Sequence, residues 1–140
     1  MKKWILIGFI VLVIAILFVF IPFFPVRVNT SFADRITLDV EDYGGREGFT
    51  TQINQDDVEA FKKVFSGWAR IDNPICPCIG VRVDFSSEDK TLSLFPAGDS
   101  CGIILFVRKE KEYYLRLNDE SNEMMREILK RYGVVWPYGI

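Results

Sequence analysis

The sequence predicts an α+β protein: an N-terminal transmembrane helix followed by a small domain with a four- or five-stranded antiparallel sheet and two helices. Three observations favour this fold class. No charged residue occurs from Trp4 to Pro25. Beyond that run, several segments alternate apolar and polar residues, as half-buried strands do. Two further segments repeat apolar residues at spacings of three and four, as amphipathic helices do.

Residues 5–24 carry no charge, and a helix of this length spans about 30 Å, the thickness of a hydrocarbon core. The run is too long for a cleaved signal peptide and lacks a small-residue cleavage site. We therefore expect an uncleaved signal anchor in the lipid bilayer of the cell membrane. Lys2 and Lys3 favour a cytoplasmic N-terminus. The expected organisation is a cytoplasmic stub and anchor over 1–25, a tether over 26–31 and an exported, extracytoplasmic domain over 32–140.

Alternating apolar and polar residues predict the strands of this domain. They are expected at 35–40, 79–85, 91–95, 103–107 and 113–117, with a shorter candidate at 49–53. Polar turns at 86–90 and 109–111 separate consecutive strands, which indicates antiparallel hairpins. In the first of these hairpins we expect Phe85 to lie opposite Leu92.

Apolar residues at helical spacing predict two helices. Asn54 is suited to cap the first one, which we expect to end before Asp72. Its apolar stripe consists of Val58, Phe61, Phe65 and Trp68. The second helix has about 12 residues from Asp119 onward, and Gly133 is well placed to end it.

Composition excludes several classes of function. After Pro25 the chain has 15 Lys and Arg against 19 Asp and Glu, so it lacks the basic surface that nucleic-acid binding needs. The chain has no histidine, which removes histidine triads and histidine metal sites. It also lacks a nucleophile elbow, a phosphate loop and a dinucleotide-binding fingerprint. We expect neither a catalytic site nor a cofactor.

Cys76, Cys78 and Cys101 are the residues best able to carry chemistry. Extending the hairpin register places Cys76 opposite Cys101, whereas a bulge at 96–100 would bring Cys78 there. We expect one disulfide, which an exported domain permits, and one remaining thiol. The alternatives are a three-thiolate site that selects Cu(I), a thiol–disulfide redox role, or three free thiols.

The half of the chain from Cys76 to Gly133 resembles a group of small bacterial proteins that have an N-terminal hydrophobic segment and a short α+β domain. Cys76-Pro77, the run Pro-Ala-Gly-Asp-Ser-Cys at 96–101 and the closing helix at 128–133 carry the resemblance. The group has no established activity, so the resemblance implies no mechanism. It does imply that Cys76 and Cys101 belong together, and Cys78 is a departure from the pattern.

The apolar tail contains Trp136 and Tyr138, which either cover the open end of the sheet or form a patch that docks a protein partner. Taken together, the sequence predicts a single-pass, membrane-anchored, extracytoplasmic protein with a non-enzymatic interaction or envelope-associated role. The alternative is a thiol-dependent Cu(I)-binding or redox protein that uses its three cysteines.

Overall fold

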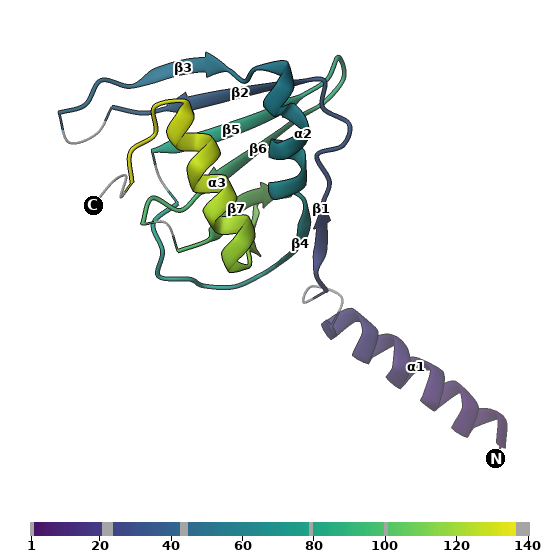
Figure 1. Ribbon diagram of the computed structural model, residues 1–140. Helices are drawn as coiled ribbons and strands as arrows, with labels where there is room; N and C mark the ends of the chain where they lie inside the picture. Colours follow the sequence, from purple (N-terminus) through teal and green to yellow (C-terminus); the bar gives the residue numbers. More distant parts are fainter. Residues whose placement is uncertain (1, 21–23, 43–44, 79, 100, 137–140) are drawn as a thin grey trace.

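The computed structural model describes residues 2–20, 24–42, 45–78, 80–99 and 101–136 (Figure 1). These residues form an α+β fold with three helices and eight strands. In chain order the elements are α1 (Lys2–Phe20), β1 (Val26–Val28), β2 (Arg35–Val40), β3 (Phe49–Gln52), α2 (Gln55–Val64), β4 (Gly67–Arg70), β5 (Val81–Ser86), β6 (Thr91–Pro96), β7 (Ile103–Arg108), β8 (Lys111–Arg116) and α3 (Asp119–Arg131).

Helix α1 extends away from the sheet (Figure 1), and its side chains from Leu6 to Ile16 are exposed. The sequence predicts a transmembrane helix over 5–24. However, no helix in the described part of the chain is long and apolar enough to cross a membrane, so this prediction is wrong. Helix α1 ends at Phe20. Its uncharged part from Trp4 onward therefore measures about 25 Å, less than the roughly 30 Å of a hydrocarbon core.

The eight strands form one antiparallel sheet in the order β1-β4-β8-β7-β6-β5-β2-β3. The expected number of four or five strands is therefore wrong. Strand β1 lies in the segment that the sequence predicts as a tether, and β4 lies where the first helix of the domain is expected to continue. These strands have three and four residues, and so short a stretch shows too little alternation to be recognised.

The hairpins among β5, β6, β7 and β8 follow the sequence pattern closely. Phe85 of β5 pairs with Leu92 of β6, which is the register expected from the sequence. The turn between β7 and β8 consists of Lys109 and Glu110, and both have positive φ angles of 50° and 62°. Two-residue hairpin turns favour this geometry because it matches the twist of the flanking strands.

Helices α2 and α3 lie on one face of the sheet (Figure 1), and the main core lies between the two layers. Each helix buries one stripe, which runs from Val58 to Val64 in α2 and from Met125 to Leu129 in α3. The Phe65 ring links these layers, because its centroid lies 5.5 Å from that of Phe85 in β5. The opposite face of the sheet carries the more polar half of each alternating strand.

Helix α2 ends earlier than the sequence predicts. Its last residue is Val64, and Trp68, which the apolar stripe places on the helix, belongs to β4 instead. The reason is the pairing of the next residues: Gly67 pairs with Val28 of β1, and the Ser66 hydroxyl hydrogen-bonds that of the buried Thr30 at 2.8 Å. Tertiary pairing thus outweighs helical periodicity at this point.

A polar network joins the start of α2 to the end of α3. The Tyr132 hydroxyl donates to Oδ2 of Asp57 at 2.7 Å and accepts from the Asn54 backbone N–H at 3.0 Å. Arg131 pairs with the other oxygen of Asp57 at 2.8 Å. Partial burial and the hydrogen bond to Asp57 raise the pKa of Tyr132. The phenol is therefore neutral at physiological pH and holds both helices together.

Candidate functional site

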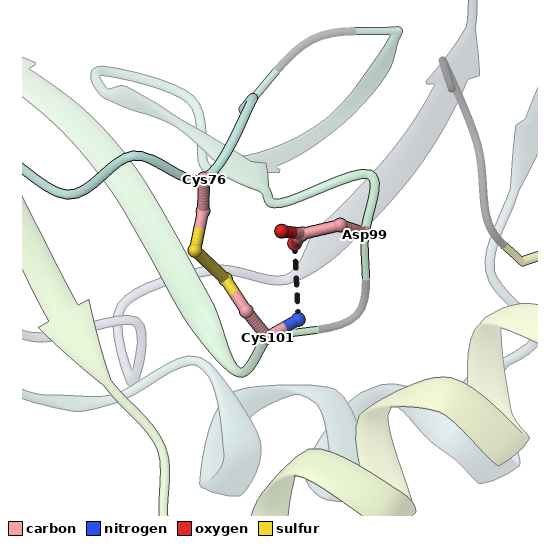
Figure 2. A group of neighbouring side chains, drawn as sticks. All are labelled: Cys76, Asp99 and Cys101. Atoms are coloured by element: carbon pink, nitrogen blue, oxygen red, sulfur yellow. Dashed lines mark hydrogen bonds between the residues drawn. A yellow bond between two sulfur atoms is a disulfide. The ribbon is translucent and has the colours of Figure 1, made fainter.

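Two loops meet beside the sheet, one between β4 and β5 and the other between β6 and β7 (Figure 2). Cys76 of the first loop and Cys101 of the second form a disulfide that closes a separation of 25 residues, with Cα atoms 6.8 Å apart. A backbone hydrogen bond from Gly98 to the Pro77 carbonyl, 2.7 Å long, joins the same loops. This is the pairing that the resemblance implies and that the extended hairpin register favours.

Asp99 points toward the disulfide, and its Oδ1 accepts a hydrogen bond from the Cys101 backbone N–H at 3.1 Å (Figure 2). The two sulfurs and a carboxylate oxygen of Asp99 all lie within 4.8 Å of one another. With the disulfide closed, the sulfurs offer no thiolates. If the bond is reduced, two thiolates and one carboxylate become available, a donor set that suits a thiophilic metal.

Cys78 is a free thiol and is not a member of this group. The structure therefore does not assemble the three-thiolate site that the sequence allows. The pKa of Cys78 is raised from 9.0 to about 11, mainly by burial. A backbone hydrogen bond with Leu105 lowers this pKa, whereas the negative charges of Asp99 and Glu112 raise it. Because the thiolate is the reactive form, Cys78 is a poor nucleophile at neutral pH.

Trp136 is one of the two residues expected to form a docking tail. It is half-buried and packs against the core. Its indole Nε1 is buried without a hydrogen-bond partner among the described residues. Tyr138 lies outside the described residues.

A groove on the outer face of β4 and β8 was not predicted. This groove, the Trp68 groove, has a volume of about 290 Å³ and is lined by Trp68, Arg70, Asp72, Tyr114 and Arg116. Strands β4 and β8 are adjacent and antiparallel, with Arg70 opposite Tyr114. The Trp68 side chain is 63% exposed, which is unusual for so large an apolar group.

The charges in the Trp68 groove differ in how they are compensated. Arg116 donates from Nη2 and Nε to Oδ2 of Asp72, at 2.5 and 3.2 Å, and this hydrogen bonding lowers the pKa of Asp72. Tyr114 donates to Oε2 of Glu112 at 2.6 Å, and this bond raises the pKa of Tyr114 to about 12. The Arg70 guanidinium has no hydrogen bond or ion pair with any described residue.

One sequence signal could have indicated the Trp68 groove. In Gly67-Trp-Ala-Arg, Ala69 is fully buried between the exposed Trp68 and Arg70, which is the alternation of a strand with one solvent-facing side. The helical stripe obscured this signal because Trp68 also fits a spacing of three from Phe65.

Two larger grooves have no tryptophan among their lining residues. One, of about 750 Å³, lies between α2 and α3, and the other, of about 400 Å³, lies near β1, β6 and β7. Among the three, the Trp68 groove alone places an exposed tryptophan beside arginines. Comparisons of the chain with protein-family models, with curated proteins and with solved structures found no match.

Proposed function

We propose that this protein is a non-enzymatic binding module of an oxidising, extracytoplasmic compartment and that the Trp68 groove is its binding site. One observation carries the proposal: Trp68 is largely exposed in a groove that also holds two arginines. Tryptophan and arginine are the residues most enriched at the energetic centres of binding sites. A ligand that covers Trp68 removes its large apolar surface from water, which favours binding.

The disulfide supports the proposed compartment. Structural disulfides persist in oxidising environments and are rare in reducing ones. The Cys76–Cys101 bond also restrains the loop that follows β4, and this loop supplies Asp72 to the Trp68 groove. The same bond therefore serves both the stability of the domain and the shape of the binding site.

The groove residues support a role in binding rather than in catalysis. Tyr114, with its pKa of about 12, holds its proton at neutral pH, and Asp72 is engaged by Arg116. The chain has no histidine to act as a general base. What the groove offers a ligand is aromatic surface, positive charge and hydrogen-bond donors.

A labelling experiment in living cells tests the proposed compartment. Cells that express the tagged full chain are quenched with acid to stop thiol exchange, and the chain is then alkylated in denaturant without reductant, with a maleimide that adds mass, and resolved by size. We expect one modified cysteine per chain, namely Cys78, and no modified cysteine in the Cys78→Ser variant. Three modified cysteines would show that the disulfide does not form in the cell and would contradict an oxidising compartment.

An array of immobilised glycans and peptides tests the binding role. The purified full chain is compared with its Trp68→Ala and Val107→Ala variants, since Val107 is another exposed apolar residue of the sheet. We expect binding to part of the array that is lost in Trp68→Ala and kept in Val107→Ala. Absence of binding to any component, or equal binding by all three proteins, would refute the proposal.

A second candidate function, metal binding that depends on reduction of the disulfide, is favoured by the proximity of Cys76, Asp99 and Cys101. Elemental analysis of the chain, purified with and without reductant and incubated with Zn²⁺ or Cu(I), tests this candidate. Metal bound at one ion per chain after reduction, and lost in Asp99→Asn, would favour it. Metal content independent of both reduction and Asp99 would exclude this site.

A further inference from the structure

We propose that the Trp68 groove binds an acidic sugar, a carboxylate-bearing ring within an anionic polysaccharide. This inference rests on the proposed binding function and names its ligand class. It is drawn from the arrangement of aromatic and basic side chains on β4 and β8, from the single uncompensated charge in the groove, and from the pairing of both of these strands on their two sides.

Aromatic and basic side chains alternate across the floor of the groove. Ala69 pairs with Leu115 and Arg70 pairs with Tyr114. Continued by one residue, the same register places Trp68 opposite Arg116. Each aromatic side chain therefore has an arginine both across the strand pair and two residues along its own strand. Opposed residues of an antiparallel pair have Cβ atoms about 5 Å apart, so one ring-sized ligand can touch all four side chains.

The unpaired positive charge of Arg70 in the groove favours an anionic ligand. Arg116 is paired with Asp72, whereas Arg70 has no ion-pair partner in the described part of the chain. A guanidinium presents a planar fork of donors that matches a carboxylate in two parallel hydrogen bonds. Arg70 therefore provides a directional site for one carboxylate, while Trp68 offers an apolar surface beside it.

A carboxylate-bearing ring fits this site better than a peptide does. An extended peptide usually binds by adding a strand to a free sheet edge, but β4 and β8, which form the groove, are each paired on both sides, and the nearest free edge belongs to β1. A docked helix needs a long apolar groove, whereas the Trp68 groove is small and contains four polar side chains among its five lining residues. A ring stacked on Trp68 needs neither a sheet edge nor a long groove.

A second positive charge lies next to the groove. Arg27 of β1 pairs with Trp68 of β4, so both side chains project from the same face of the sheet. Arg27 is exposed and, like Arg70, forms no ion pair with the described residues. Arg27 thus lies beside Trp68 on the neighbouring strand, and Arg70 lies two residues along β4 on the same face. A polymer with a carboxylate on every unit can engage both arginines, which is why we assign a polysaccharide rather than a single sugar.

Isothermal titration of the purified full chain tests the ligand class with three probes. Oligogalacturonate carries rings and carboxylates, a galactose oligomer of the same length carries rings only, and a polyglutamate peptide carries carboxylates only. We expect oligogalacturonate to bind about tenfold or more tightly than either of the other probes, because only it satisfies both Trp68 and Arg70.

Three variants and one control variant locate the site. Trp68→Ala should weaken oligogalacturonate binding about tenfold, and Trp68→Phe should restore part of it. Arg70→Gln should abolish the preference for oligogalacturonate over the neutral oligomer. Arg126→Gln, which removes an exposed arginine of α3 on the opposite side of the protein, should change neither quantity. The melting temperature of each variant is measured to show that it is folded.

Each remaining outcome contradicts the inference. Tighter binding of polyglutamate would identify a site for acidic peptides. Equal binding of the charged and neutral oligomers would show that the arginines do not select a carboxylate. Binding unchanged by Trp68→Ala and Arg70→Gln would place the site elsewhere, and no binding of oligogalacturonate would exclude this ligand class. The array experiment distinguishes failure of this inference from failure of the proposed function. If binding on the array still depends on Trp68, only the ligand class is wrong. If no binding on the array depends on Trp68, the proposed binding function is wrong as well.

Discussion

Replacing Cys76 by serine removes the covalent link between the two loops beside the sheet, and its effect on stability follows from the length of chain that the link encloses. The disulfide closes a separation of 25 residues. In the loop-entropy treatment, a closed loop of this length stabilises the folded state by about 3.5 kcal/mol. For a domain of this size, such a loss lowers the melting temperature by about 10–15 °C.

The assay is urea and thermal denaturation of the purified full chain, without reductant, for four variants. Cys76→Ser and Cys101→Ser should lower the free energy of unfolding equally, because each breaks the same bond. The double variant should lose no more than either single one. Cys78→Ser is the matched control, and it should cost less than about 1 kcal/mol because Cys78 forms no covalent bond.

Two results would refute this reasoning. If Cys78→Ser is the most damaging change and Cys76→Ser is mild, the pairing is Cys78–Cys101. If the double variant loses the sum of the two single losses, Cys76 and Cys101 act independently and share no bond.

Three further predictions concern single side chains. Tyr132→Phe removes the hydrogen bonds of the phenol to Asp57 and to the start of α2. It should therefore lower the free energy of unfolding, measured in urea, by about 1–2 kcal/mol. An unchanged free energy would show that these bonds contribute no net stability. Glu112→Gln removes the carboxylate that raises the pKa of Tyr114 to about 12. Alkaline titration followed by phenolate absorbance should therefore show this pKa move toward 10. An unchanged titration curve would show that another group raises the pKa. The Cys78 thiol, whose pKa lies about two units above 9.0, should react with iodoacetamide about a hundredfold more slowly at neutral pH than it does in the unfolded chain. Its rate should keep rising up to about pH 11, whereas a plateau near pH 9 would disprove the effect of burial.

The parts of the fold that sequence predicts well are those formed by neighbours in the chain. Strand β5 alternates regularly, and short polar turns join β5 to β6 and β7 to β8, so the two hairpins and the register of Phe85 with Leu92 follow from local pattern. The same register brought Cys76 close to Cys101. Neither inference needed knowledge of any distant segment.

The parts that sequence missed depend on pairing between distant segments. Strand β4 exists because it fits between β1 and β8, which lie far from it in the chain, and its own four residues show little pattern. Trp68 continued the apolar stripe of α2, but periodicity cannot say where a helix ends. The Trp68 groove is built from β4 and β8 together, and for this reason no local motif revealed it.

The transmembrane prediction failed for a different reason. It counted uncharged residues over 5–24 and took the helix to be as long as the run. In the structure α1 begins at Lys2 and ends at Phe20, so the helix and the uncharged run have different limits. Composition reports how apolar a segment is, whereas the length of its helix also depends on where the helix begins and ends.

The strand order has a consequence for how each new chain is assembled. Strands β1 and β4 join the rest of the sheet only through β8, which is synthesised last among the eight described strands. A ribosome releases the chain from its N-terminus onward, so β1 and β4 are made long before the strand that connects them to β7. A chain truncated before Lys111 would therefore lose three sheet positions rather than one. Every new molecule gains its Trp68 groove only after β8 has been synthesised.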